Sequence, residues 1–325
     1  MAPAPNSAAG SHSPGSIGAS VDIGSNSVHL VVAEITDDAL RPLLDESVFL
    51  GLGNAVHDGA PLGATARAGL TAALTRYATA ARGLGGTQVT FLGTEPLRRA
   101  PDAARIVSEV QRATRAPLHV LSHEEEALLT LIGVTEGRPI DRELLVIDIG
   151  GGSYEFAFVG PGRPAHAEGL RLGSARLTAS HVRHDPPTVD EIEAMTRAAR
   201  VILDAARVVR PDGVVGVGGT ASNLVKLLPE ALADMTLTRD RLAAIRTILE
   251  TTPASDLTTR FLVNPVRARL LGAGAAIVDA ILERSGVDAM RVSKASLREG
   301  AILAVERVGP SWRDRLPDLA HGWRP

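Results

Sequence analysis

The sequence has no cysteine, only two lysines among its 34 basic residues, and an aromatic content of 3%. Without cysteine there can be no disulfide framework, no thiolate metal site and no thiol nucleophile. No apolar run approaches the roughly 20 residues that a membrane-spanning helix needs. The net charge of −3 predicts no general affinity for nucleic acids or anionic membranes. A polyanionic ligand would therefore need a local cluster of basic residues.

What remains is ordinary soluble composition, with 45% hydrophobic and 22% charged residues. At 325 residues the chain is expected to form two domains. Residues 1–16, rich in Ala, Pro, Ser and Gly, are expected to form a disordered tail without signal-peptide features, so a cytoplasmic location is expected. The break at Gly137-Arg-Pro139 places an N-terminal domain at 17–137 and a C-terminal domain at 138–308, and 309–325 are expected to be a flexible tail.

The most informative stretch joins an apolar run to a glycine-rich turn. Residues 144–147 are apolar and predict a buried strand, which leads into Asp148, three consecutive glycines at 150–152, and Ser153. A strand, a glycine turn and a second strand place backbone N–H groups around a concavity that suits phosphate oxygens. Asp148 and Glu155 could hold a hard cation beside that phosphate. A tight hairpin in a core, capped by Asp148, is the alternative on this stretch alone.

The same pattern occurs twice. Asp22-Ile-Gly-Ser-Asn-Ser-Val-His-Leu30 aligns without a gap with the segment from Asp148 to Phe156. Two copies of one strand–turn–strand unit suggest two related halves that face each other across a cleft. A third glycine loop, residues 214–220, follows another short apolar run. The candidate phosphate-binding residues of the three loops are Gly24, Ser25, Asn26, Ser27, Gly150, Gly151, Gly152, Ser153, Gly218, Gly219 and Thr220.

Strand-like and helix-like segments alternate along the chain, which is typical of an α/β protein. Ser122 with Glu125 three residues later matches a capping box, so a helix is expected to begin there. Residues 266–284 are apolar enough to form a buried helix. Other helices are expected at residues 65–82, 103–114, 189–208 and 295–305.

Further motifs, in chain order, resemble one known family. They are Gly93-Thr-Glu-Pro-Leu-Arg98, residues 122–134, Arg171-Leu-Gly173, Gly216-Val-Gly-Gly-Thr220 and Leu297-Arg-Glu-Gly300. With the first two glycine loops, they make the sequence similar to the Ppx/GppA phosphatases of the actin-like, sugar-kinase and Hsp70 superfamily. The resemblance covers roughly residues 20–305.

The resemblance implies a two-domain α/β fold of the actin-like ATPase type, which is ribonuclease H-like, with the active site in the interdomain cleft. It implies an exopolyphosphatase, a hydrolase that releases terminal orthophosphate from inorganic polyphosphate. By this resemblance Glu126 activates water and Arg98 faces the phosphate. Phosphoanhydride hydrolysis also requires, on chemical grounds, a group that orients water in line with phosphorus.

The expected cofactor is a divalent cation. Asp148 and Glu155 are its expected ligands, and Asp22 either joins them or only caps its own turn. Oxygen ligands, the lack of cysteine and the lack of a histidine pair at useful spacing favour Mg²⁺ or Mn²⁺ over Zn²⁺.

Four positions depart from the family pattern. His123 stands where the family usually has Gly, Leu128 where it has Arg, and Tyr154 where it has Thr, while Lys294-Ala295 replaces Asp-Gly. They leave alternatives open: a guanosine pentaphosphate phosphohydrolase, an ATP-dependent kinase on the same fold, or a non-catalytic sensor of polyphosphate or nucleotides. No nucleic-acid or membrane partner is expected, and a homodimer is left open. Longer relatives carry a further C-terminal domain of the HD type, so a preference for short to medium polyphosphate is expected here.

Overall fold

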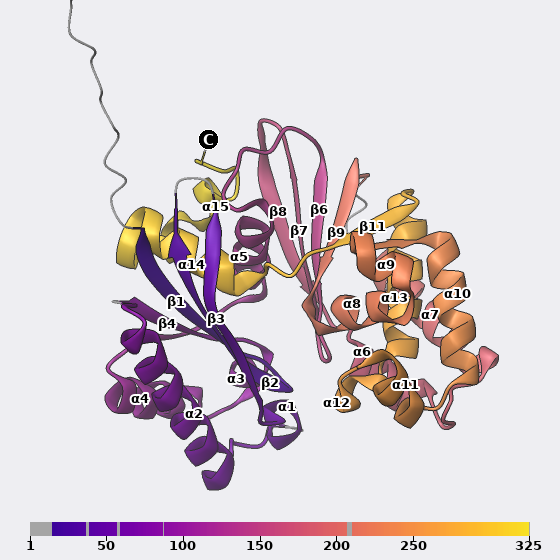
Figure 1. Cartoon of the computed structure of the whole chain (residues 1–325), viewed down its shortest axis with the longest axis horizontal. Coiled ribbons are helices and arrows are strands. Elements are labelled where there is room, and N and C mark those ends of the chain that lie inside the picture. The colour runs from indigo at the N-terminus through magenta and orange to yellow at the C-terminus, as the bar shows by residue number, and fades with distance from the viewer. Residues whose placement is uncertain (1–14, 37–38, 57–58, 87, 207–209, 325) are drawn as a thin grey trace, which may run out of the picture.

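The structure is a computed structural model that describes residues 15–36, 39–56, 59–86, 88–206 and 210–324. It consists of two lobes, each built on a mixed sheet (Figure 1). The expected disordered tail at 1–16 lies outside the described residues except at its end, where the first strand, β1, already begins at Ser16. No helix of the described ranges is long and apolar enough to cross a membrane.

The first sheet has the order β3-β2-β1-β4-β5. Its first three strands form an antiparallel meander, and β4 and β5 continue the sheet in parallel with β1. The strands are β1 (Ser16–Ile23), β2 (Ser27–Ile35), β3 (Leu40–Phe49), β4 (Gln88–Gly93) and β5 (Leu118–Val120).

The second sheet repeats this plan with one strand added, in the order β10-β11-β9-β6-β7-β8. Asp148 pairs with Glu155 across β6 and β7, and Asp22 pairs with His29 at the equivalent place in β1 and β2. The two halves inferred from the gapless alignment are therefore confirmed. The strands are β6 (Leu144–Ile149), β7 (Tyr154–Gly160), β8 (Arg163–Leu170), β9 (Gly213–Val217), β10 (Thr236–Thr238) and β11 (Ala289–Val292).

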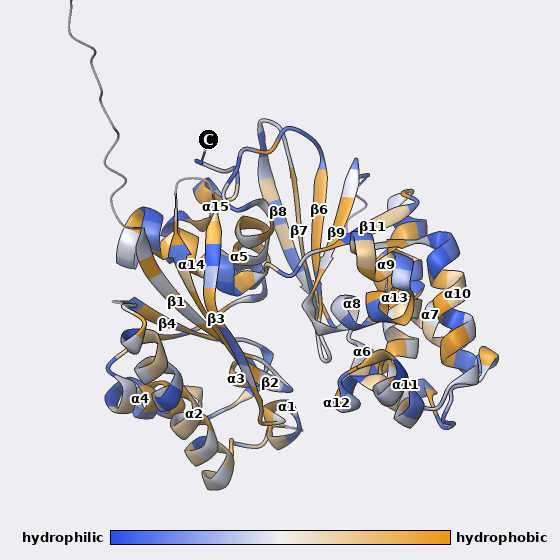
Figure 2. Ribbon diagram, viewed as in Figure 1, coloured by the Kyte–Doolittle hydropathy of each residue, from blue (hydrophilic) through white to orange (hydrophobic). Residues whose placement is uncertain are grey.

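Helices cover the outer face of each sheet. The first lobe carries α1 (Leu52–Ala55), α2 (Ala64–Gly83), α3 (Glu95–Arg99) and α4 (Ala103–Thr114). The second lobe carries α6 (Ser174–His181), α7 (Val189–Asp204), α8 (Gly218–Leu224), η2 (Val225–Leu227), α9 (Pro229–Asp234), α10 (Arg239–Thr251), α11 (Ala254–Phe261), α12 (Pro265–Ala268) and α13 (Leu271–Ser285). Most residues of α13 are buried, as its apolar sequence predicted. Figure 2 shows the matching pattern, with β6 and β7 largely apolar and with both polar and apolar turns along α10.

Two helices fill the space between the sheets, namely α5 (His123–Thr135) and α14 (Leu297–Val308). They cross at glycine, and a Cβ at Gly300 would lie 1.8 Å from the carbonyl oxygen of Leu129. A Cβ at Gly133 would lie 2.0 Å from the oxygen of Ser296. Such a close approach requires glycine on both helices. The capping box of α5 is confirmed, since Ser122 and Glu125 bond to each other's backbone.

The C-terminal part of the chain differs from the expected domain pattern. Helix α14 follows β11 of the second sheet but packs on α5 and β1, so the chain returns to the first lobe near its end. Residues 309–325 were expected to be flexible, but as far as residue 324 they form η3 (Gly309–Arg315), α15 (Leu316–Leu319) and a short extension. Trp312, Leu316 and Leu319 are buried in the core that contains α5 and α14. The burial of these three side chains explains why the segment is ordered.

Candidate active site

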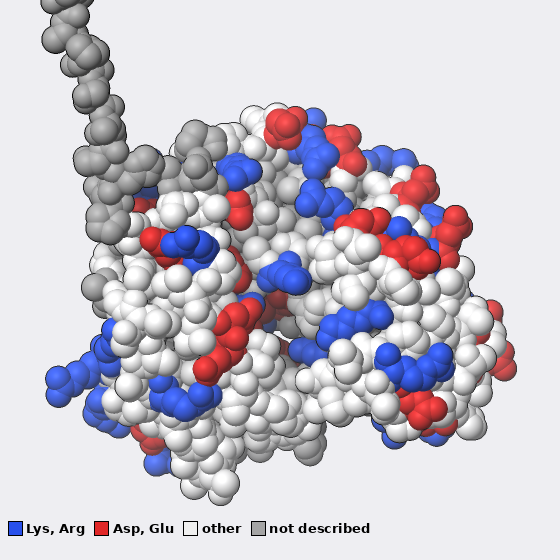
Figure 3. Space-filling view, in the orientation of Figure 1, with Lys and Arg blue, Asp and Glu red and all other residues white. Residues whose placement is uncertain are grey.

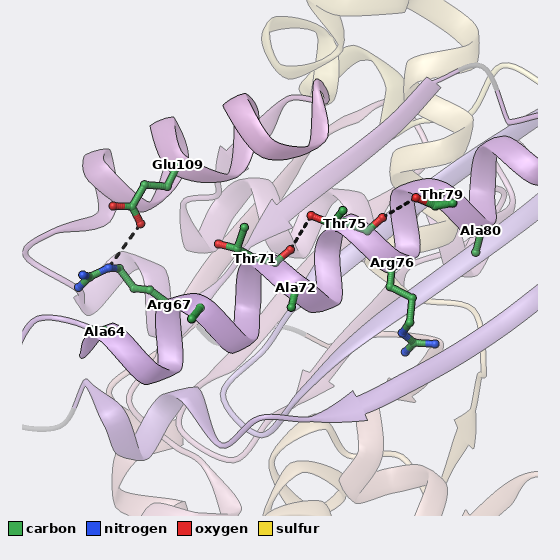
Figure 4. Close-up of a pocket in the computed structure, with 10 residues that line it drawn as sticks. Ala64, Arg67, Thr71, Ala72, Thr75, Arg76, Thr79, Ala80 and Glu109 are labelled. Atoms are coloured by element: carbon green, nitrogen blue, oxygen red, sulfur yellow. Dashed lines mark hydrogen bonds and ion pairs between the residues drawn. The ribbon is translucent and has the colours of Figure 1, made fainter.

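Two large hollows differ in what lines them. One is a groove along α2 beside α4, lined mainly by alanine and threonine and crossed by an ion pair between Arg67 and Glu109 (Figure 4). The other is a cleft of about 540 Å³ between the lobes, lined by glycine loops, carboxylates and basic side chains. Figure 3 shows this hollow facing the viewer, with acidic surface on its left wall and basic surface on its right. The cleft, unlike the groove, brings together the carboxylates and glycine loops that the sequence singled out.

The two repeated glycine loops lie on opposite walls of the cleft. In each loop the first glycine N–H donates to the carbonyl oxygen three residues later, Gly24 to Ser27 and Gly150 to Ser153, both at 3.1 Å. Among the described residues, the N–H groups of Ser25, Asn26, Gly151 and Gly152 have no hydrogen-bond acceptor, and all four residues line the cleft. All eight residues predicted from the two loops line it, namely Gly24, Ser25, Asn26, Ser27, Gly150, Gly151, Gly152 and Ser153.

The third predicted loop is the start of α8. Gly218 and Gly219 line the cleft. A Cβ at Gly218 would lie 2.4 Å from Asp148 Oδ1, so only glycine allows this approach. Thr220 does not line the cleft: it is buried beneath, where its hydroxyl contacts Ser174 Oγ at 3.3 Å. The structure thus places the Thr220 side chain in a packing position beneath the cleft wall, and not in the cleft as the sequence predicted.

Six carboxylates line the cleft, and four of them are the predicted catalytic and metal-ligating groups: Asp22 on β1, Asp148 on β6, Glu155 on β7 and Glu126 on α5. Burial raises the pKa of Asp22 to about 8, with a further contribution from the charge of Glu126, and burial raises that of Asp148 to about 6. Burial and neighbouring carboxylates also raise the pKa values of Glu126 and Glu155. The cluster therefore needs positive charge to be ionised at neutral pH.

Arg98 provides part of that charge from behind the cleft wall. Its Nη1 donates to Glu126 Oε2 at 2.5 Å and its Nη2 to Glu155 Oε1 at 3.2 Å. Arg98 does not itself line the cleft, so the structure places it as a partner of these two carboxylates. His123 Nδ1 lies 2.7 Å from Glu155 Oε1, and burial together with Arg98 lowers its pKa. The sequence marked His123 only as a departure from a family pattern and did not reveal this contact.

The carboxylates fit a divalent cation on structural grounds. Asp22 Oδ1 is buried and has no hydrogen-bond partner among the described residues. A cation would satisfy that oxygen and offset the burial, and the repulsion between neighbouring carboxylates, that raise the pKa values. The donors are carboxylate oxygens, which Mg²⁺ and Mn²⁺ accept. A second group of possible metal ligands consists of His123, Glu126 and Glu155, whose ligand atoms all lie within 4.8 Å of one another. The guanidinium of Arg98 contacts all three of these side chains.

Basic side chains form the other side of the cleft. Arg267 is partly buried and packs on Gly219, where a Cβ would lie 2.0 Å from its guanidinium carbon. Arg298 pairs with Asp45 at 3.1 Å. Lys226 and Lys294, the only two lysines of the chain, both line this cleft although they are far apart in sequence. They give the local basic cluster that the overall charge of −3 made necessary.

Glu95 is a site residue that the sequence did not single out. It is 9% exposed, accepts a hydrogen bond from Ser25 Oγ at 2.7 Å, and pairs with Arg99 at 2.7 Å. A Cβ on Gly152 would lie 3.2 Å from Glu95 Oε1. Glu95 therefore holds the first glycine loop while it touches the second.

Comparisons with known proteins agree with this geometry. A sequence model described as the Ppx/GppA phosphatase family matches residues 31–307. Exopolyphosphatase 1 of Mycobacterium tuberculosis is 28% identical over 304 residues, which cover 87% of this chain and 86% of that protein. The guanosine-5'-triphosphate,3'-diphosphate pyrophosphatase of Vibrio cholerae is 27% identical over 87% of this chain but 58% of that protein. The crystal structure of the Ppx/GppA family member of Aquifex aeolicus superposes with a TM-score of 0.80 at 27% identity, covering 90% of this chain and 98% of that one.

Proposed function

The chain belongs to the Ppx/GppA phosphatase family, and we propose that it is an exopolyphosphatase that removes terminal orthophosphate from inorganic polyphosphate. The proposal rests on one observation: the two repeated glycine loops and Glu126 line the same cleft. Free backbone N–H groups on both walls suit the oxygens of a terminal phosphoryl group. The basic wall suits the phosphates that follow it in the chain.

In this mechanism Glu126 orients a water molecule and takes a proton from it as the water oxygen bonds to phosphorus. The bond between that phosphorus and its bridging oxygen breaks, and the shortened polyphosphate leaves with the bridging oxygen. The glycine loops hold the non-bridging oxygens as charge spreads over them in the transition state. Arg98 favours the ionised form of Glu126, which a base must have.

A divalent cation is part of the proposal. Asp148 and Glu155, with Asp22, are the residues that would hold Mg²⁺ or Mn²⁺, whose role is to neutralise charge on the phosphate oxygens. Glu126 and Glu155 both contact Arg98, so the base and a cation ligand share one guanidinium. Loss of Arg98 would therefore disturb both functions together.

A guanosine pentaphosphate phosphohydrolase is the second candidate. The Vibrio cholerae relative is nearly as similar to this chain as the exopolyphosphatase. Both reactions break a terminal phosphoanhydride bond, so the same residues would serve either. A cytoplasmic location and a homodimer also remain proposals, which cell fractionation and sedimentation of the purified protein would test.

The test compares phosphate release from polyphosphates of defined length, guanosine pentaphosphate and ATP, with Mg²⁺ and no acceptor. Release of phosphate from polyphosphate in the absence of nucleotide would support a hydrolase. Activity only with ATP and an acceptor would indicate a kinase. No phosphate release from any of these substrates would favour a sensor.

Glu126→Gln should reduce the rate by ~10²–10⁴-fold, because it preserves side-chain volume and removes the base. Glu124→Gln is the matched control, since Glu124 is the exposed neighbour on the same helical turn. Retention of more than a tenth of the wild-type rate by Glu126→Gln would exclude Glu126 as the base.

A further inference from the structure

A further hollow of about 300 Å³, distinct from the cleft and from the groove along α2, lies at the start of β4 and β5, against the C-terminal segment of the chain. It is separate from the cleft: Gln88 lines the hollow, whereas Thr94, just after the far end of β4, lines the cleft. Gly93 is five positions after Gln88 along the strand, a length of about 17 Å. We propose that this hollow is an effector site for a phosphate monoester with an apolar or aromatic body, such as a nucleoside monophosphate, and that binding there raises the rate of the reaction at Glu126.

The charge of the hollow selects an anion. Arg82 and Arg115 line it, and no carboxylate is among its lining residues. Arg82 Nη2 donates to the carbonyl oxygen of Thr114 at 2.6 Å, which fixes its guanidinium beside the next residue, Arg115. No ion pair of Arg115 occurs with the residues that the structure describes. Guanidinium groups bind phosphate oxygens through paired hydrogen bonds, so two arginines that line one hollow suit one phosphate group.

The remaining lining selects an apolar body of limited size. Val89, Val305 and Trp312 are among the apolar residues of the wall. In the described part of the chain, β5 pairs with β4 only from Phe91 onward, so the edge of β4 is open at Val89. The N–H of Phe91 donates to the carbonyl oxygen of Pro117, just before β5. Because the direction of N–H groups alternates along a strand, the N–H of Val89 points to the same side, which is the side of the hollow. A volume of about 300 Å³ is at the lower end for small-molecule sites. It suits a mononucleotide better than a long polyphosphate.

The wall of the hollow is connected to the catalytic helix. The rings of His119 and Trp312 meet edge to face with centroids 5.3 Å apart. Arg313, next to Trp312, donates to both carboxylate oxygens of Glu125 at 2.7 and 2.8 Å. Glu125 closes the capping box at the start of α5, and the following residue is Glu126. A ligand that holds Trp312 in place therefore also holds Arg313 and the first turn of α5.

Binding is the first test, and AMP is the probe because it has no phosphoanhydride bond to hydrolyse. Calorimetric titration should show saturable binding to the wild type, weaker binding of inorganic phosphate, and at least roughly tenfold weaker AMP binding to Arg115→Ala, since a hydrogen bond to a charged group is lost. Arg112→Ala is the matched control, because Arg112 is exposed on α4 and does not line the hollow. Equal AMP affinity in the wild type and Arg115→Ala would overturn the site.

Coupling is the second test, and it depends on the proposed hydrolase activity, whereas the binding test does not. AMP should raise kcat for tripolyphosphate without raising KM in the wild type and in Arg112→Ala. Arg115→Ala should keep the basal kcat and lose the stimulation. Arg313→Ala should keep AMP binding and also lose the stimulation, because the contact with Glu125 is absent. An increase in KM alone would mean that AMP competes in the cleft, and it would refute the coupling.

Discussion

Replacement of Gly300 by alanine tests whether the close crossing of α5 and α14 holds the catalytic helix in place. The new Cβ would lie 1.8 Å from the carbonyl oxygen of Leu129, about 1.6 Å short of the 3.4 Å at which ordinary contact begins. Backbone cannot rotate away as a side chain can, so the helices must separate. Overpacking of this kind costs ~1–3 kcal/mol, and contact with backbone favours the upper end. Alanine regains about 1 kcal/mol of helix propensity over glycine, so a net loss of roughly 2 kcal/mol is expected.

Gly69→Ala is the matched control. Gly69 is also inside a helix, α2, but a Cβ there meets no atom within 4 Å, so only the gain of about 1 kcal/mol remains. Urea unfolding followed by circular dichroism should lower the midpoint for Gly300→Ala and raise it for Gly69→Ala. Gly300→Ala should also lose activity under conditions where it is still folded, because α5 carries Glu126. Equal upward shifts of the midpoint in both variants would refute the crossing as described.

Three further predictions concern the metal, the substrate and pH. EDTA should abolish activity, and Mg²⁺ or Mn²⁺ should restore it. Asp148→Asn and Glu155→Gln should each raise the metal concentration that is needed for half-maximal activity, because each loses a charged oxygen ligand. Unchanged metal titrations in these variants would exclude both residues as ligands. A cleft of about 540 Å³ can contact only a few phosphates, so affinity for polyphosphate should depend only weakly on salt concentration. In a time course on long polyphosphate, all chains should shorten gradually. Full-length chains that persist beside free phosphate would instead indicate processive action. Burial opposes ionisation of Glu191, but hydrogen bonds from the Thr188 and Arg183 N–H groups and from His184 outweigh it and lower its pKa to about 2. Because the pKa of Glu191 is lower in the folded state than its value near 4.5 in the unfolded state, its ionised form stabilises the fold at pH values above 4.5. The difference in free energy of unfolding between wild type and Glu191→Gln, measured by urea unfolding, should therefore be constant near neutral pH. It should decrease as the pH falls from 4.5 toward 2.

Local sequence patterns predicted what depends on neighbouring residues. The gapless alignment from Asp22 and from Asp148 predicted two equivalent hairpins, and the structure gives both the same register. Ser122 and Glu125 predicted a helix start because a capping box is complete within four residues. These features need no knowledge of the rest of the fold.

What the sequence could not reveal depends on distant contacts. Trp312 lies in a short segment rich in Arg and Pro, and its burial requires surfaces from α5 and α14. His123 approaches Glu155 only because α5 packs beside β7, 32 residues away in sequence. Thr220 follows two glycines that do reach the cleft, but helix α8 turns its side chain inward toward Ser174. The sequence did not mark Lys226 and Lys294 as cleft residues, because they are far apart in the chain and meet only in the folded structure.

The return of α14 to the first lobe has a consequence for biosynthesis. The ribosome synthesises β1 and β2 early. Val31 and Ala33 of β2 are covered by Ile302 of α14, which is synthesised roughly 270 residues later. A Cβ on Gly18 would lie 2.5 Å from the side chain of Ile302, so this surface is shaped for that one helix. Until then the nascent first lobe exposes an apolar face. We expect this face of the sheet to bind chaperones throughout synthesis of the second lobe and to be covered only when translation is almost finished.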